Sequence, residues 1–224
     1  MRHLHQNLVL ALALTASWTA FGAGGGPSMP AGSPSIQSRE PPSPEEQARA
    51  AYNSGIQAVE KADELIADAA RQTDARKQEK LSGKAGKAYA SAIKKFERAT
   101  ELRPGMYQAW NYLGYCNRKQ GRYDVALAAY DRALSLKPDY AEAIEYRGHA
   151  YLGLNRLPEA KEAYLALFGA NRKLASSLLA AMQQWVGGHQ DDAEFASWVS
   201  ERSAIASQTA ALTREGAAAS WPGK

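Results

Sequence analysis

The residue types that most often carry out catalysis or bind metals are few in this chain of 224 residues, and they lie far apart. Cys116 is the only cysteine, and beyond the first few residues the histidines are His149 and His189. A Cys/His nucleophile or a zinc site needs several such side chains close together. A Gly-rich phosphate loop and a His-Glu-x-x-His motif are also absent. We therefore expect no catalytic residues, no metal site and no cofactor, and predict that the protein is not an enzyme.

One acidic cluster and the single thiol have two interpretations each. Asp191, Asp192 and Glu194 resemble a metal-binding cluster, but carboxylates at the start of a helix are more simply explained as helix caps. Cys116 is either a buried structural thiol, which we favour, or an exposed thiol that pairs with a partner. A single cysteine cannot form an internal disulfide.

The composition favours helices and gives little support for nucleic-acid binding. Ala, Leu, Lys, Glu and Gln dominate residues 45–215, whereas Val, Ile and Thr are sparse. The formal net charge is only +4. Because nucleic-acid binders concentrate Lys and Arg on one face, this small excess predicts no nucleic-acid partner.

The first residues have the pattern of an export signal. A basic start at Arg2, an apolar run over residues 8–16 and small residues at Ala20–Gly22 predict a signal peptide over residues 1–22. The apolar run is too short for a permanent anchor, so we expect no membrane span after cleavage. Residues 23–43 are rich in Gly, Pro and Ser, which predicts a flexible linker. The mature protein should be periplasmic or secreted.

A helical pattern begins abruptly after the linker. Ser43 followed by Pro44-Glu45-Glu46 combines a hydroxyl cap, a proline in the first turn and acidic residues near the helix start. Apolar and small residues then recur at helical spacing to about Leu212. The pattern predicts an all-α protein of antiparallel helical hairpins. Breaks are expected at Pro104-Gly105, Gly121, Pro138-Asp139, residues 153–155, Gly169 and Gly187-Gly188.

The helical region repeats with a period of 34 residues, as the spacing of Pro104 and Pro138 shows. Two helices approach closely where side chains are small, and large residues fill the gaps between them. The same spacing joins Ala92 to Ala126, Phe96 to Tyr130, Ala99 to Ala133, Gly114 to Gly148, Ala126 to Ala160 and Tyr130 to Tyr164.

Residues 109–138 resemble a tetratricopeptide repeat (TPR) in the sequence pattern of both helices. The third unit, residues 141–168, follows the pattern less closely, with Ile144, Arg147 and Leu167 in place of signature residues. The resemblance implies a TPR solenoid of about three repeats over residues 44–170. The signature positions of the second unit hold Trp110, Leu113, Gly114, Ala126, Tyr130, Ala133 and Pro138.

The first unit is longer than a standard repeat. Gly55 and Ala92 are 37 residues apart, whereas Gly114 and Ala126 are 12 apart. The added residues are helical in character and contain one plausible turn at residues 72–74, capped by Thr73 or Asp74. We therefore predict an elongated first hairpin that projects from the stack. Its charged side chains, which include Lys61, Asp63, Glu64, Asp68, Arg76, Lys77, Glu79 and Lys80, are expected in water.

Two further helices should follow the repeats. Residues 171–186 and 191–212 have helical spacing, and a repeat stack needs a terminal cap. Trp185, Phe195, Trp198 and Val199 supply the apolar face for this role. Together these segments form the C-terminal capping region, residues 171–212, and residues 213–224 are a tail.

The TPR resemblance implies a partner-binding groove lined by the first helix of each hairpin. Four of its residues are tyrosines, and rigid aromatic side chains with one polar group are good anchors for a peptide. Alternatively, the tyrosines fill space between adjacent hairpins. Some TPR domains bind a free C-terminus with Lys, Asn and Arg at defined groove positions, but these positions here hold Tyr52, Ile56, Tyr112, Glu142 and Tyr146, so we do not expect that ligand. The candidate residues are Tyr52, Asn111, Tyr112, Tyr115, Arg118, Glu145, Tyr146 and His149.

These features predict a protein-interaction scaffold of the cell envelope. The expected partner is another envelope protein or a peptide segment held in the TPR groove. The alternative is a structural protein that self-associates, as a possible homo-oligomer, through the elongated hairpin or the C-terminal helices.

Overall fold

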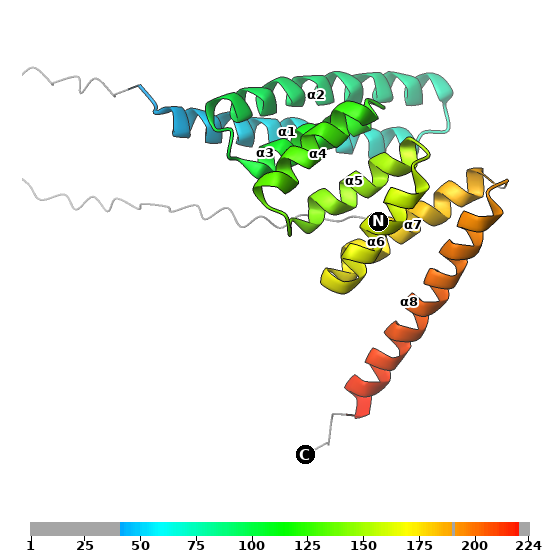
Figure 1. The fold of residues 1–224 in the computed structure, drawn as a ribbon. Helices are drawn as coiled ribbons and strands as arrows, with labels where there is room; N and C mark the ends of the chain where they lie inside the picture. Colours follow the sequence, from blue (N-terminus) through cyan, green and yellow to red (C-terminus); the bar gives the residue numbers. More distant parts are fainter. Residues whose placement is uncertain (1–40, 190, 220–224) are drawn as a thin grey trace, which may run out of the picture. The chain divides into compact units, whose positions relative to one another are not determined.

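The computed structural model describes residues 41–189 and 191–219, with side chains described up to residue 212. The predicted signal peptide and residues 23–40 of the predicted linker lie outside the described residues. Within the described part, every regular element is a helix, which confirms the all-α prediction (Figure 1). The helices are α1 (Pro44–Ala70), α2 (Ala75–Leu102), α3 (Tyr107–Lys119), α4 (Tyr123–Leu136), α5 (Ala141–Gly153), α6 (Leu157–Ala170), α7 (Arg172–Gly188) and α8 (Ala193–Ala219).

The first hairpin is elongated, as the sequence predicted. Helix α1 has 27 residues and α2 has 28, against 13 and 14 for α3 and α4. Ser43 and Glu46 form a capping box at the start of α1, and Asp74 caps α2 by accepting from the N–H groups of Arg76 and Lys77. The closed end of the α1–α2 hairpin extends beyond α3 and α4 (Figure 1).

Glycines allow close approach of the helices within a hairpin. A Cβ atom at Gly55 would lie 2.6 Å from the ring of Phe96, and one at Gly114 would lie 2.5 Å from the ring of Tyr130. Phe96 and Tyr130 are fully buried and 34 residues apart, so the two hairpins repeat one packing arrangement. The turns after α3 and α5 are also alike, because Gly121 (φ 73°) and Asn155 (φ 57°), each two residues after the helix end, share the left-handed conformation.

The third hairpin, α5–α6, is closed by the helix that follows it. A Cβ atom at Gly148 would lie 2.6 Å from Leu178 of α7. Leu178 therefore occupies the place that Phe96 and Tyr130 have in the first two hairpins. Helix α6 ends at Ala170, and Asn171 then caps α7. The sequence predicted the break at Gly169, two residues before Asn171.

Helices α7 and α8 cover the end of the third repeat. Trp198 of α8 lies edge-on to Tyr164 of α6, with ring centroids 5.5 Å apart. Phe195 and Val199 are buried in the same core cluster. Asp192 accepts a hydrogen bond of 2.9 Å from the N–H of Phe195, as a helix cap does. Helix α8 continues to Ala219, so residues 213–219 of the predicted tail are helical.

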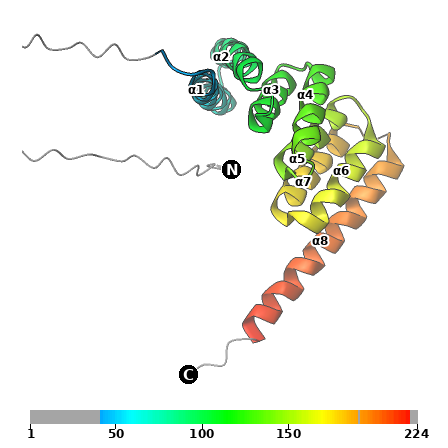
Figure 2. The same cartoon turned by 60° about the vertical axis from the view of Figure 1, so that its left-hand side comes forward.

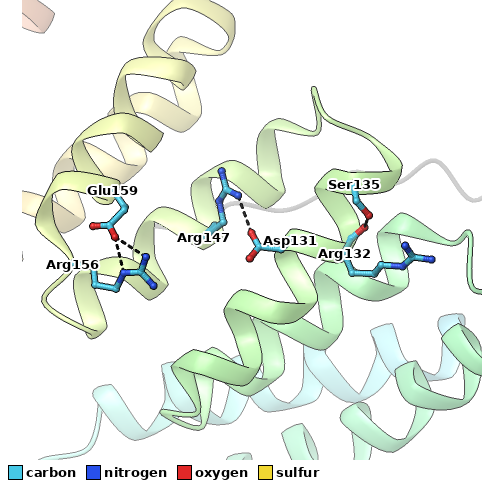
Figure 3. A network of polar contacts seen from close by, with 6 residues as sticks. All are labelled: Asp131, Arg132, Ser135, Arg147, Arg156 and Glu159. Carbon is cyan, nitrogen blue, oxygen red and sulfur yellow. Dashed lines mark hydrogen bonds and ion pairs between the residues drawn. The ribbon is translucent and has the colours of Figure 1, made fainter.

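The junction between the second and third hairpins is partly polar. Arg147 of α5 takes the place of the signature leucine and forms an ion pair of 2.8 Å with Asp131 of α4 (Figure 3). Leu113, its counterpart in α3, is 8% exposed within the apolar core. At this repeat position, the third hairpin therefore has an ion pair with its neighbour where the second hairpin has apolar contacts.

The first helices of the repeats lie on one side of the array and the second helices on the other (Figure 2). Helix α3 contacts α5, and α5 contacts α7, whereas α2, α4 and α6 make no comparable contacts with one another. The side formed by α1, α3, α5 and α7 is therefore the inner side, on which a partner would meet several repeats at once.

Candidate functional site: the inner tyrosine surface

The inner side of the array carries half-buried aromatic and basic residues. We call this set the inner surface, and six of the eight candidates from the sequence belong to it. Helix spacing explains the arrangement, because Tyr112 and Tyr115 are three residues apart and so share one face of α3. Its residues are Tyr52 of α1, Tyr112, Tyr115 and Arg118 of α3, and Tyr146 and His149 of α5.

The four tyrosines form a continuous row across three helices. The ring centroids of Tyr52 and Tyr112 are 6.0 Å apart, those of Tyr112 and Tyr115 are 6.4 Å apart, and those of Tyr115 and Tyr146 are 5.2 Å apart. Such distances are typical of favourable aromatic contacts. The row therefore joins repeats that are distant in sequence.

The row also packs on the core of the array. Tyr112 stacks on the buried ring of Phe96 at 5.4 Å, and Tyr146 lies 6.3 Å from the buried ring of Tyr130. The two interpretations of these tyrosines are thus compatible. Each ring has one side against the array and remains partly accessible on the other.

Asp63 is a polar anchor that the sequence analysis misplaced. Its carboxylate accepts hydrogen bonds from the hydroxyl of Tyr115, at 2.8 and 2.9 Å, and from that of Tyr89. The expectation that Asp63 lies in water is therefore wrong. Asp63 follows Tyr52 by 11 residues, or about three helical turns, and this spacing places both on the side of α1 that faces α3.

Burial and the Asp63 carboxylate keep the row protonated. Burial raises the pKa of Tyr115 above its ordinary value, and the nearby negative charge of Asp63 raises it further. Burial likewise raises the pKa of Tyr52 and Tyr146. The hydroxyl groups are therefore neutral near pH 7. That of Tyr115 donates to Asp63, whereas those of Tyr52 and Tyr146 can donate to a partner.

Arg118 and Lys119 add positive charge beside the row. The guanidinium carbon of Arg118 lies 5.4 Å from the ring centroid of Tyr115 and 5.5 Å from that of Tyr146, within the range of a cation–π interaction. The ammonium nitrogen of Lys119 lies 5.6 Å from the centroid of Tyr115. Among the described residues, neither cation is within ion-pair distance of a carboxylate.

Two candidates are buried beneath the inner surface. Asn111 is 1% exposed and Glu145 is 5% exposed, so the prediction that they touch a partner is not met in this structure. The repeat places them at the same position of α3 and α5, and packing within the array covers that position. Asn111 Oδ1 has no hydrogen-bond donor among the described residues. Glu145 lies 3.7 Å from Nε2 of His149.

The other side chains that could take part in catalysis or metal binding are buried or do not form a site. Burial lowers the pKa of His149, although its hydrogen bond to Glu145 opposes this effect, so the imidazole is neutral near pH 7. Cys116 is fully buried, which confirms the prediction of a structural thiol, and burial raises its pKa to about 12. Among the described residues, no three His, Cys, Asp or Glu side chains are arranged to hold a metal ion. None of the described helices is both long and apolar enough to cross a membrane.

Two family models, each described as a tetratricopeptide repeat, match residues 83–145 and 117–184. The chain is therefore a TPR protein. TPR domains are protein-interaction modules, so the fold defines a scaffold for protein contacts. The two matches overlap over residues 117–145, from the end of α3 to the start of α5.

The comparison with solved structures includes the first TPR of Spaghetti (RPAP3), bound to the HSP90 peptide SRMEEVD. It is 21% identical in sequence, with a TM-score of 0.41, and the match covers 56% of this chain and 94% of that one. The comparison with curated proteins gave no match.

Proposed function

We propose that this protein is an interaction scaffold of the cell envelope that holds an extended segment of a partner protein against its inner surface. The observation that carries the proposal is the row of four tyrosines across α1, α3 and α5. An extended segment can lie along the whole row and so contact three repeats at once.

The chemistry of the row favours a particular kind of segment. Tyrosine rings offer large contact area at a small cost in side-chain entropy, and their hydroxyl groups can bond to a peptide backbone. Arg118 has no carboxylate partner among the described residues and lies over two of the rings. The segment should therefore carry apolar or aromatic side chains with an acidic residue opposite Arg118.

The best test compares two tyrosines of the same helix. Tyr146 belongs to the inner surface, whereas Tyr151 lines a separate cavity of about 360 Å³ with Ile144 and Arg147. Both are half-buried, so both changes to alanine remove a similar side chain. Immobilised protein should capture a partner from envelope extract, and isothermal titration with that partner should then give the affinities.

We expect Tyr146→Ala and Arg118→Ala to weaken binding by about 1 to 4 kcal/mol each, as side chains at the centre of an interface do. Tyr151→Ala should bind like the unchanged protein. Circular dichroism must show that all variants remain folded. Equal affinities for the Tyr146 and Tyr151 variants would show that the partner does not use the inner surface.

The envelope location has a separate test. The basic start, apolar run and small residues of the first 22 positions motivate it. Protein recovered from the periplasm should begin between about Ala20 and Gly26. Cytosolic protein that retains Met1 would exclude export.

Self-association is the second candidate. Light scattering over a concentration series should report a constant mass if the protein acts as a scaffold for another protein. A mass that doubles with concentration would favour the structural alternative.

A further inference from the structure

A second surface lies on the opposite side of the first hairpin from α3. It contains a cavity of about 630 Å³ along α1 and α2. Four lysines and a strip of small and apolar residues form its lining, which contains no carboxylate. We call it the lysine face: Gln57, Ala58, Lys61 and Leu65 of α1, and Lys84, Lys87, Ala88, Ser91 and Lys95 of α2.

The lysine face lies at the beginning of the repeat stack, and no other described helix packs extensively on it. Tyr52 and Asp63 mark the side of α1 that meets α3, through Tyr112 and Tyr115. The lysine face lies on the other side, and α1 and α2 have no extensive contacts with described helices beyond each other and α3. The next hairpin differs in this respect, because α2 packs against its first helix, α3. In the described part of the chain, the first hairpin thus lacks the preceding helix that packs against the second hairpin.

The charge of this face has one sign. Among the described residues, none of its lysines is within ion-pair distance of a carboxylate. Lys95 donates a hydrogen bond of 3.1 Å to the carbonyl of Ser54, which leaves Lys61, Lys84 and Lys87 for an outside ligand. A terminal repeat needs only a polar outer face to remain soluble, and a mixture of both signs would provide it. Helix α8, at the other end, is mixed: Glu201 pairs with Arg202.

The shape of the face fits a helix. Ala58, Leu65 and Ala88 are half-buried and leave a shallow apolar strip between the lysines. Ala58 and Leu65 are seven residues apart, so the strip is about 10 Å long on α1 alone. Small side chains allow a second helix to approach closely, and the lysines on both sides could reach carboxylates along its edges.

We propose that the lysine face binds an amphipathic helix of a partner protein, with Leu and Ala along its apolar stripe and Glu on both sides of that stripe. The lysines would supply charge complementarity, and the apolar strip would supply buried area. This contact is independent of the inner surface, so one protein could hold an extended segment and a helix at the same time.

The experiment uses a fluorescent synthetic peptide of about 18 residues, long enough as a helix to span Lys84 to Lys95. The peptide has a Leu/Ala stripe with Glu at its edges, and the control peptide has Lys in place of each Glu. Fluorescence anisotropy with the full chain should show binding of the Glu peptide only. Binding should weaken as salt concentration rises, because salt screens the charges.

The variants locate the site. Lys84→Glu/Lys87→Glu should weaken binding of the Glu peptide about tenfold or more, because like charges then face each other. Arg132→Glu/Lys173→Glu makes the same change in net charge at exposed basic residues outside the lysine face, and should bind normally. Tyr146→Ala should also bind normally, which separates this surface from the inner one. If the first variant does not fold, Lys84→Gln/Lys87→Gln takes its place.

Four outcomes would overturn the proposal. The first is that the Glu peptide does not bind, and the second is that the lysine-face and control variants bind it equally. The third is that the protein dimerises and that Lys84→Glu/Lys87→Glu abolishes the dimer. The fourth is that the protein binds phosphatidylglycerol vesicles through these lysines but does not bind the peptide. The last two would assign the face to a second copy of the chain or to a lipid surface.

Discussion

Asp63 of α1 links three helices through one carboxylate, which accepts hydrogen bonds from the hydroxyl of Tyr89 on α2 and from that of Tyr115 on α3. A buried hydroxyl without an acceptor costs stability, so this arrangement fixes the position of Tyr115 in the inner surface. A residue that looked like part of a charged, solvated arm therefore supports the candidate site.

Replacing Asp63 should show how much this anchor contributes. Asp63→Ala leaves the hydroxyls of Tyr89 and Tyr115 without their acceptor and should lower the free energy of unfolding by about 1 to 3 kcal/mol. Asp63→Asn retains one acceptor oxygen and should lower it less. Urea titrations followed by circular dichroism measure both values. Equal stability of the alanine variant and the unchanged protein would show that water replaces the carboxylate.

Two glycines allow a matched test of the packing. At Gly114 an added Cβ would meet Tyr130, whereas at Gly83 nothing lies within 4 Å. Gly114→Ala should therefore cost about 1 to 3 kcal/mol through overpacking. Gly83→Ala should add about 1 kcal/mol, because alanine is the better helix former. Thermal melts should show a lower melting temperature for Gly114→Ala and a higher one for Gly83→Ala. Shifts of both melting temperatures in the same direction would contradict this account of the hairpin.

The residues beneath the site were harder to predict than its surface. The 34-residue repeat placed Tyr112, Tyr115 and Tyr146 on one side because helical spacing alone determines the face. It could not show that Asn111 and Glu145 are covered, since burial depends on how closely neighbouring helices approach. Asp63 was missed because its acceptor role depends on two tyrosines, 26 and 52 residues later in the chain.

At the scale of helices, the sequence was most informative where a cap or a turn residue is present. The capping residues Ser43 and Asp74 marked the starts of α1 and α2, and Gly121 marked the end of α3. Prediction was weaker where such signals are ambiguous. Gly169 lies inside α6, which ends at Ala170, and Asn171 caps the next helix.

The junction of α4 and α5 is a helix-scale feature with a testable consequence. The Nε of Arg147 is buried and has no hydrogen-bond acceptor among the described residues, although the guanidinium pairs with Asp131 (Figure 3). Arg147→Leu restores the signature residue and removes this unpaired group. We expect the free energy of unfolding to remain equal or to rise by about 1 kcal/mol.

Chemical denaturation of Arg147→Leu measures this change, and Arg156→Leu is the control. Arg156 pairs with Glu159 at 2.6 Å on the exposed start of α6, so its loss should have little effect on stability. A large loss of stability in Arg147→Leu alone would show that the ion pair holds the two hairpins together.

For the whole molecule, the buried tyrosines predict loss of stability in alkali. Burial raises the pKa of several tyrosines, including Tyr89, Tyr115 and Tyr140, above the ordinary value of 10.0. Below pH 10 both the folded and the unfolded chain keep these protons. Above it the unfolded chain releases them first, so the free energy of unfolding should fall as the pH rises.

Tyrosinate absorbance and urea titrations at a series of pH values test this expectation together. The folded protein should show tyrosines that ionise only as it unfolds, and stability should change little between pH 7 and about 9 from this cause. If every tyrosine ionises near pH 10 while the protein remains folded, the row is more open to solvent than its contacts indicate.

The single thiol provides a measure of how often the repeat array opens. Cys116 is fully buried in α3, at the middle of the chain's repeats, and its raised pKa keeps the sulfur in the unreactive protonated form. A thiol reagent can therefore react only when the second hairpin opens and exposes the sulfur. The labelling rate then reports how often the centre of the scaffold opens, and a partner bound across α1, α3 and α5 would slow it in proportion to how firmly it holds the repeats closed.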